Sequence, residues 1–248
     1  MNPAEFANIA RSEQRFWWYG GMNEIMFRLL DPIARARQFD RVLEAGCGTG
    51  YFASLLENRY RWRMFPIDLG WRGLQFAQSL GLERLAQANI ASLPFAAAAF
   101  DAVLSMDVIV HFPRGEEAAA MSEFARVLAP GGLLAVRVSA LDILRSRHSQ
   151  FAHERQRFTR KRLIKAAENF GIAVERCTYA NSLLMPVALA KFRLWEPLMR
   201  QPPSSGVDPV SPGLNRLLRV PLAIEANCIG AGINFPVGQS LILIGTRK

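Results

Sequence analysis

The stretch RVLEAGCGTG (residues 41–50) decides the fold of this chain. A short apolar run at residues 41–45 predicts a buried β-strand, and the glycines at alternate positions after it predict a tight turn. Residues 51–57 then have the pattern of a helix. This order brings backbone N–H groups to a helix N-terminus, where they can bind an anionic group of a ligand. An ordinary strand-to-helix turn would show the same glycines, so the loop alone identifies no ligand.

Outward from this stretch, short apolar runs alternate with helical patterns, which is typical of a parallel sheet covered by helices. The fold class we predict is α/β, with a doubly wound and mostly parallel seven-stranded sheet. Besides residues 41–45, strands are predicted at residues 63–67, 82–87, 100–106, 133–138, 172–179 and 240–246.

The alternation also predicts how the chain is organised. Residues 1–36 are helical in pattern and unusually aromatic, and we expect them to form an N-terminal cap. Residues 37–181 and 236–248 supply the sheet core. Residues 182–235 do not continue the alternation and contain two apolar helical stretches. We predict a helical insertion before the last strand, serving as a substrate cover or a dimer interface.

Composition narrows the class of protein. The chain has 248 residues, of which 50% are hydrophobic and 21% charged, so it can bury a sizeable core and is not mainly disordered. Its net charge of +9 favours anionic partners. Three cysteines do not make a disulfide scaffold, and no apolar run suits a signal peptide or a membrane span. We expect a cytoplasmic protein, with contact at a membrane surface left open.

A carboxylate follows the glycine loop at an informative distance. Asp68 ends the next predicted strand, 22 positions (68 − 46) after Gly46. A carboxylate there can accept hydrogen bonds from two ribose hydroxyls, although a strand-end Asp can equally cap the next helix. Together, the loop and Asp68 predict an adenosine-type ligand at the carboxyl edge of the sheet.

Further motifs follow in a fixed order and carry a family resemblance. Over residues 38–180 the chain resembles the class I S-adenosylmethionine-dependent methyltransferases, and it is most similar to their small-molecule enzymes. That family has a Rossmann-like fold. After the loop introduced by Glu44, the motifs are Asn89-Ile90, Leu93-Pro94-Phe95, Phe100-Asp101-Ala102-Val103 and Arg126-Val127-Leu128-Ala129-Pro130-Gly131-Gly132.

The resemblance implies S-adenosylmethionine as methyl donor and S-adenosylhomocysteine as product. The loop would hold the methionine moiety, Asp68 the ribose, and Leu69 would pack near adenine. Asn89 stands where the family usually has Asp, and its amide oxygen could accept from the adenine amino group. The implied cofactor-binding residues are Glu44, Gly46, Cys47, Gly48, Thr49, Gly50, Asp68, Leu69, Asn89, Ile90, Met106, Asp107 and Val108.

Residues for the acceptor are less defined. A general base is needed only if the acceptor must lose a proton, and histidine suits that role near neutral pH. The candidate bases are His111, His148 and His153, although the first could be structural and the others surface residues. No metal site is predicted.

Two further segments could contact the acceptor. The aromatic residues Trp17, Trp18 and Tyr19 could form a lid that excludes water, or pack as core. Arg157 lies in a basic segment, residues 145–165, which could attract an anion or be a solvated face.

We therefore predict an enzyme, an S-adenosylmethionine-dependent methyltransferase acting on a small or lipophilic molecule by O-, N- or C-methylation. RNA methylation and a non-catalytic cofactor-binding module remain alternatives. We expect no DNA partner, and we rank RNA below a small molecule. A homodimer and a peripheral membrane contact stay open.

Overall fold

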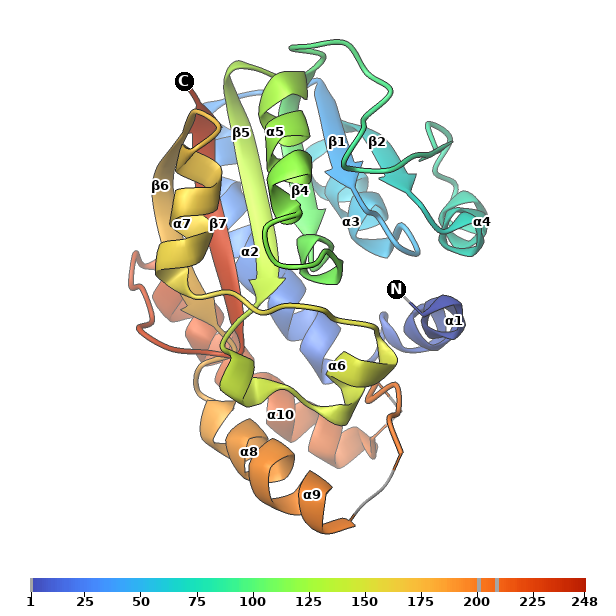
Figure 1. The fold of residues 1–248 in the computed structure, drawn as a ribbon, viewed down its shortest axis with the longest axis vertical. Helices are drawn as coiled ribbons and strands as arrows, with labels where there is room; N and C mark the ends of the chain where they lie inside the picture. The colour runs from blue at the N-terminus through green and yellow to red at the C-terminus, as the bar shows by residue number, and fades with distance from the viewer. Residues whose placement is uncertain (1, 200–201, 208–209) are drawn as a thin grey trace.

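The computed structural model describes residues 2–199, 202–207 and 210–248. It contains a seven-stranded sheet of order β3-β2-β1-β4-β5-β7-β6, in which only β7 runs antiparallel to its neighbours (Figure 1). The predicted α/β fold with a mostly parallel sheet is confirmed. The strands are β1 (Arg41–Ala45), β2 (Arg63–Asp68), β3 (Ala86–Gln87), β4 (Phe100–Met106), β5 (Leu128–Ser139), β6 (Ile172–Ala180) and β7 (Ser240–Arg247).

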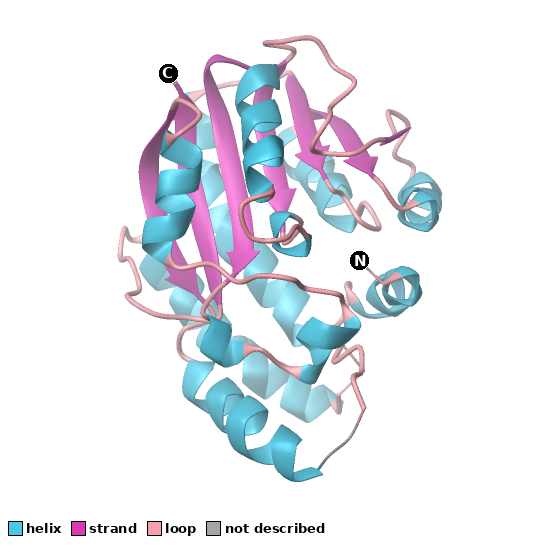
Figure 2. Cartoon of the chain, viewed as in Figure 1, coloured by secondary structure: helices cyan, strands magenta, loops and turns pink. Residues whose placement is uncertain are grey.

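Helices cover both faces of the sheet, giving three layers (Figure 2). The inner strands are buried on both faces along most of their length, so their apolar residues do not alternate with exposed polar ones. One core cluster joins the sheet to α5 (Glu117–Val127) and α7 (Arg160–Glu168). The other joins it to α2 (Trp17–Ala36), α3 (Tyr51–Tyr60), α4 (Trp71–Ser79) and α10 (Pro212–Gly230).

The remaining helices are short and lie at the carboxyl edge of the sheet (Figure 1). They are α1 (Pro3–Ser12), α6 (Arg147–Phe151), α8 (Met185–Ala190) and α9 (Glu196–Met199), with a π-helical turn (Lys191–Trp195) between the last two. Two single 3₁₀ turns, Ile109–His111 and Asp142–Leu144, follow β4 and β5.

Two strands and one helical stretch differ most from the sequence predictions. The strand predicted at residues 82–87 shrinks to two residues, because the Leu82 N–H donates to the Ala77 carbonyl (3.3 Å) and closes α4 instead. β5 starts five residues before its predicted start at residue 133 (133 − 128 = 5). The Pro130-Gly131-Gly132 part of the last motif lies within this strand, where the pairing with β4 is irregular. The first of the two apolar helical stretches predicted within residues 182–235 is divided into α8, the π turn and α9.

The late insertion packs on the N-terminal cap as well as on the sheet. α10 lies along α2, and a Cβ at Gly21 would stand 2.2 Å from Leu222 Cδ1. Leu222, Ala226 and Ile229 are buried in the same core cluster as Met22 and Ile25 of α2. The cap and the insertion therefore share one core with the sheet.

This packing predicts a large difference between two leucines of α10. Leu222→Ala should lower the free energy of unfolding by about 2–5 kcal/mol, because its fully buried side chain leaves a cavity between α2 and α10. Leu217→Ala is the matched control. The Leu217 side chain is 66% exposed, so this substitution should lower the free energy of unfolding by no more than about 0.5 kcal/mol. Equal losses in chemical denaturation would contradict the proposed α2–α10 contact.

Candidate functional site

The glycine loop lies where β1 ends, beside the point at which the strand order reverses between β1 and β4. The N–H groups of Gly46 and Cys47 both donate to the Ile67 carbonyl of β2 (2.9 and 2.8 Å). Gly48 has a φ of +58°, and a Cβ built on it would meet no heavy atom within 4 Å. The α3 N-terminus, capped by Gly50, has no side-chain cap. Open space at Gly48 and a helix N-terminus without a side-chain cap, both at a switch point of the sheet, suit a ligand.

Two carboxylates stand behind this loop. Asp68 accepts from Gly48 N (2.8 Å) and Gly70 N (2.7 Å), so it holds the loop in shape. Glu44 is buried, and its Oε2 has no hydrogen-bond partner. Burial, reinforced by the nearby Asp68 charge, raises the pKa of Glu44 to about 8. Burial also raises the pKa of Asp68. Burial thus disfavours the charged forms of both groups, and we call the region around Glu44, Asp68 and the glycine loop the acidic pocket.

The N-terminal cap closes over the loop. The Thr49 hydroxyl donates to Glu13 Oε2 (2.5 Å), next to the end of α1. Phe6 of α1 covers α4, where Cβ atoms at Gly70 and Gly73 would stand 2.5 and 2.7 Å from its ring. Burial raises the pKa of Glu13 to about 7, although the Thr49 hydrogen bond opposes the shift. Glu13 therefore adds a third carboxyl group to the pocket.

The pocket continues to the end of β4, where Asp107 meets Arg137 of β5. Arg137 Nε lies 2.8 Å from Asp107 Oδ2, and its guanidinium lies 5.1 Å from the Trp18 ring centre. Asp107 has a φ of +60°, which is unusual for a residue other than glycine. Its Oδ1 is buried without a partner. Asp107 thus keeps one oxygen for the pocket while Arg137 fixes the other.

The three histidines fall in different surroundings. His111 ends the 3₁₀ turn after β4, and its Nδ1 lies 3.2 Å from the His153 carbonyl, so Nδ1 carries the proton and Nε2 is free to accept. Burial lowers the pKa of His111 to about 4, which keeps it neutral. His148 Nδ1 lies 3.8 Å from buried Glu5, and His153 is exposed.

The expected adenine edge is open to solvent. Leu69 is 67% exposed beside Asp68, although it is a large apolar side chain. Asn89 Oδ1 accepts from Ala91 N (2.9 Å), so this oxygen closes its own turn, and Ile90 is buried beneath it. Met106 and Val108 are half-buried, and Val108 packs on Gly46. Burial raises the pKa of Cys47 well above its usual value, which suits a packing residue.

The predicted acceptor residues divide into two groups. The rings of Trp18 and Tyr19 meet edge-to-face, with their centres 5.1 Å apart, beside the acidic pocket. The backbone N–H of Trp17 instead donates to Asn215 Oδ1 of α10 (2.7 Å). Arg157 lies elsewhere: it is buried, and it donates to Glu154, the Ala140 carbonyl and Ser149. Its guanidinium is engaged within the chain and does not line the acidic pocket.

Sequence reasoning missed Glu13 and Arg137. Arg137 had a signal, because it is a single charge in the otherwise apolar run LLAVRV of β5. A charged side chain on a buried strand needs an opposite charge close by, and Asp107 at the end of the neighbouring strand β4 supplies it. Glu13 had none, because it follows a short polar helix and is buried only by tertiary packing.

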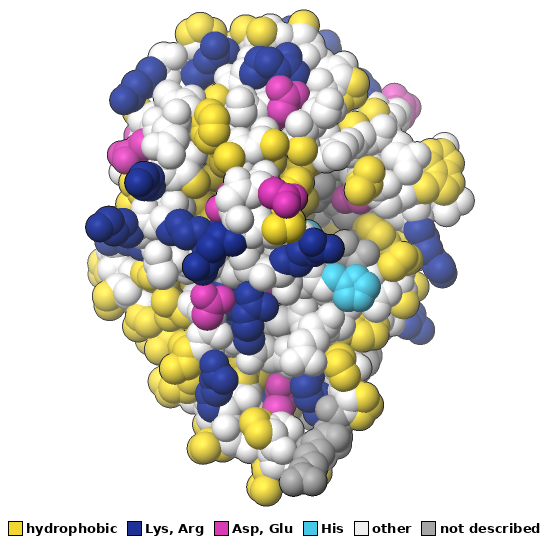
Figure 3. All heavy atoms as spheres, viewed as in Figure 1, with side chains coloured by type: hydrophobic (Ala, Val, Ile, Leu, Met, Phe, Trp, Pro, Cys, Tyr) yellow, Lys and Arg dark blue, Asp and Glu magenta, His cyan; other side chains and the backbone are white. Residues whose placement is uncertain are grey.

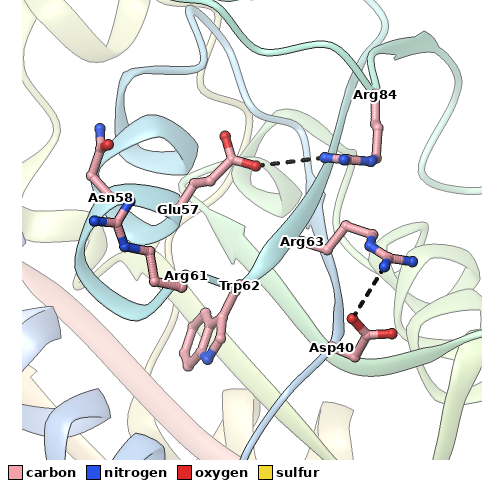
Figure 4. A pocket seen from close by; sticks show the side chains of 7 residues that line it. All are labelled: Asp40, Glu57, Asn58, Arg61, Trp62, Arg63 and Arg84. Atoms are coloured by element: carbon pink, nitrogen blue, oxygen red, sulfur yellow. Dashed lines mark ion pairs between the residues drawn. The ribbon is translucent and has the colours of Figure 1, made fainter.

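A second hollow lies at the opposite, amino edge of the sheet (Figure 4). It has a volume of about 500 Å³ and is lined by Asp40, Glu57, Asn58, Arg61, Trp62, Arg63 and Arg84. Its ion pairs are long and exposed, at 3.7 Å for Arg63–Asp40 and 3.6 Å for Arg84–Glu57. Exposed ion pairs of this kind contribute little to folding stability, and we assign this hollow no role in the chemistry.

Comparison with known proteins identifies the domain that carries the acidic pocket. Residues 43–136 match the family model described as a methyltransferase domain. These residues form a class I S-adenosylmethionine-dependent methyltransferase domain. The match spans β1, the glycine loop, Asp68 and β4, and the family predicted from the ordered motifs is confirmed.

Curated relatives share this methyltransferase domain. A probable S-adenosylmethionine-dependent methyltransferase of Mycobacterium tuberculosis is 34% identical over 121 residues, which is 48% of this chain and 42% of the relative. A fatty-acid O-methyltransferase of Mycolicibacterium smegmatis is 39% identical over 97 residues (37% and 34%). A probable tRNA methyltransferase 9B of Mus musculus is 35% identical over 116 residues (44% and 25%). The chain thus spans less than half the length of these relatives.

Solved structures extend the likeness to the whole fold. A Haloferax volcanii methyltransferase, solved in complex with the Trm112 methyltransferase activator, aligns over 99% of this chain and 98% of its own. The TM-score is 0.60 at 19% identity. At that identity the comparison supports the fold alone.

The methyl donor of this family is S-adenosylmethionine, and the residues of the acidic pocket fit it. The donor carries positive charge on its sulfonium and its amino group. Glu44 Oε2 and Asp107 Oδ1 are buried acceptors without partners, and the space in front of Gly48 admits a ligand. Exposed Leu69 beside Asp68 offers an apolar surface for adenine.

The glycines of the loop predict two different failures. At Gly46, which has a φ of +87°, an alanine Cβ would lie 2.4 Å from Val108 Cγ2. Because of this overpacking, Gly46→Ala should lower the free energy of unfolding by about 1–3 kcal/mol more than Gly48→Ala does. Gly48→Ala places its methyl in open space, so it should mainly weaken donor binding. Thermal melting and calorimetry would check this; equal destabilisation by both variants would contradict it.

Asp68 predicts a loss of donor affinity. Asp68→Asn should weaken S-adenosylmethionine binding by about 1–3 kcal/mol in calorimetry, because charge-assisted hydrogen bonds are lost. The matched control is Asp101→Asn. That carboxylate also accepts from two backbone N–H groups, Asp40 N (3.0 Å) and Arg41 N (2.9 Å), at the amino edge. Unchanged affinity in Asp68→Asn would remove Asp68 from the site.

The raised pKa values predict a pH dependence. Without ligand, Glu44 and Glu13 hold protons up to about pH 8 and about pH 7, whereas in the unfolded chain they ionise near 4.5. The unfolded state then binds fewer protons, so stability should fall as pH rises from about 4.5 to 8. A cationic donor favours the ionised carboxylates, so its affinity should rise about tenfold per pH unit below the pKa for each proton released.

Calorimetry in two buffers of different ionisation enthalpy would count the protons released. Glu13→Gln keeps an acceptor for Thr49 and should remove part of the release. Affinity that is independent of pH would contradict a cation-binding role for these carboxyl groups.

Proposed function

We propose that this chain transfers a methyl group from S-adenosylmethionine to a small or lipophilic molecule. The observation that carries the proposal is the closure of the donor site by the cap, through Glu13 on Thr49 and Phe6 on α4. The acceptor would reach the donor beside Trp18, which lies over Arg137. The similarity to a fatty-acid O-methyltransferase supports the same class of acceptor.

The donor, when bound, supplies a methyl group already activated on a sulfonium. The chain then has to hold the donor, orient the acceptor and exclude water, and positioning accounts for much of the rate. Glu44, Asp68 and Asp107 would hold the donor. Arg137 would position Asp107 through their ion pair (2.7 Å), and Trp18 over Arg137 would exclude water.

His111 is the histidine best placed to remove a proton from the acceptor. It lies three residues after Val108 in the turn that follows β4, and its ring is oriented by the His153 carbonyl, which leaves Nε2 to accept a proton. His148 faces Glu5 instead, and His153 is exposed. We therefore assign the base role to His111 and leave the other two without a role.

Transfer of radiolabelled methyl groups to a panel of fatty acids, phenols and amines, followed by lipid extracts, tests the proposal. His111→Ala should lower kcat by about 10²–10⁴, the usual range for a general base, with donor affinity unchanged. His153→Asn is the matched control, because it keeps the carbonyl that orients His111, and asparagine tolerates its φ of +58°. Full activity of His111→Ala would remove His111 as the base.

RNA methylation is the second candidate, favoured by the net charge of +9 and the similarity to a tRNA methyltransferase. Its basic segment, however, is largely engaged within the chain: Arg145 binds the Arg155 carbonyl (2.8 Å), and Arg162 binds Glu117 (3.0 Å). RNA binding that weakens steeply with salt would favour this candidate. Donor binding without turnover on any acceptor would favour a non-catalytic module.

A further inference from the structure

The outer faces of the insertion helices carry large apolar side chains. On α10, Leu217 is 66% exposed, while Leu222 is fully buried against α2, so this helix is apolar on two sides. A helix that packs on only one side gains nothing from a second apolar face unless something covers it. The exposed apolar residues are Leu183, Val187, Leu194, Trp195, Leu198 and Met199 around α8 and α9, and Leu214, Leu217, Val220 and Ile224 on α10. We name these residues the apolar face.

The charges on these helices have one sign. The exposed basic residues are Lys191 and Arg193 on the π turn and Arg216 and Arg219 on α10. Among the described residues between 183 and 224, Glu196 is the one acid, and its Oε2 accepts from the Arg147 N–H (2.9 Å). Figure 3 shows hydrophobic side chains recurring over the end of the molecule where α8 and α9 lie, with Lys or Arg side chains among them.

This combination points to one kind of occupant. We propose that the apolar face docks the protein on the surface of an anionic lipid bilayer. Leucine and tryptophan side chains enter the boundary between headgroups and acyl chains, and lysine and arginine contact anionic headgroups. Trp195, which is 58% exposed, is of the residue type enriched at that boundary.

A second copy of the chain fits this surface less well. A two-fold dimer places the same patch on both partners, so Lys191 and Arg216 would face a surface with the same excess of positive charge. Like charges across an interface oppose association, whereas an anionic bilayer complements them. None of the described helices is long and apolar enough to cross a membrane, so contact would be at the surface.

The apolar face also lies next to the cap of the methyltransferase domain. Asn215, at the start of α10, accepts from the Trp17 N–H (2.7 Å) and donates to the Arg15 carbonyl (2.8 Å). Docking through α10 would therefore place the aromatic cap close to the bilayer. The docking surface goes beyond the proposed function, and its test needs no turnover.

The test is co-sedimentation of the full chain with vesicles of phosphatidylcholine and phosphatidylglycerol in a three-to-one ratio, roughly the charge of an anionic membrane. The wild type should bind, and it should bind vesicles of phosphatidylcholine alone at least tenfold more weakly. The double variant Leu194→Glu/Leu198→Glu, at positions 70% and 77% exposed, should lose binding at least tenfold. Lys191→Glu/Arg216→Glu should lose it as well, and raised salt should weaken wild-type binding.

Leu80→Glu, at the end of α4 and 37% exposed, is the control substitution outside the apolar face and should bind as the wild type does. Melting temperatures and S-adenosylmethionine binding confirm folding in each variant, so failure of docking and failure of donor binding are separate results. No vesicle binding by the wild type, or equal binding to neutral vesicles, would overturn the proposal. So would a wild-type dimer that Leu194→Glu/Leu198→Glu makes monomeric.

Discussion

The structure depends on several carboxyl groups gathered at the carboxyl edge of one sheet, of which Glu44 and Glu13 are buried. Four of them converge where β1 and β4 end: Glu44, Asp68, Asp107 and Glu13. The nearby cation is Arg137, which forms an ion pair with Asp107. Buried acids repel one another and lose hydration, which is why the pKa of Glu44 rises to about 8. A cationic ligand relieves this cost. The pocket is therefore best understood as a site completed by its ligand, and the positive methyl donor of the family has the required charge.

Closure of the site comes from segments far apart in the chain. Glu13 holds Thr49, Ser205 donates to buried Glu5 (2.9 Å), and Asn215 holds the start of α2. The cap and the late insertion thus brace each other over the sheet, and both pack into one core. The cap and the insertion are in this way connected by packing and hydrogen bonds to the glycine loop. Substitutions in the insertion can then change donor binding without touching the donor.

Much of the fold could be predicted from the sequence, because its strands and helices have clear hydrophobic patterns and the glycine loop lies between a predicted strand and a predicted helix. β1 and β4 have the predicted ends, while β3 is shorter because Leu82 closes α4. The position of Asp68 beside the glycine loop was also predictable, and the structure joins the two through the Gly48 N–H (2.8 Å). Glu13 was not, since its burial arises from tertiary docking alone. Arg157 shows the opposite error: a basic segment predicted an accessible cation, but the side chain is buried in an ion pair with Glu154 (2.6 Å).

The central claim is that the acidic pocket takes a cationic adenosine ligand. Calorimetric titration of the purified protein with S-adenosylmethionine and, separately, with NADH tests it most directly, because both ligands carry an adenosine but NADH is an anion. The account predicts micromolar binding of S-adenosylmethionine and no binding of NADH. Binding of NADH, or no binding of S-adenosylmethionine at a pH where the carboxyl groups are ionised, would contradict it.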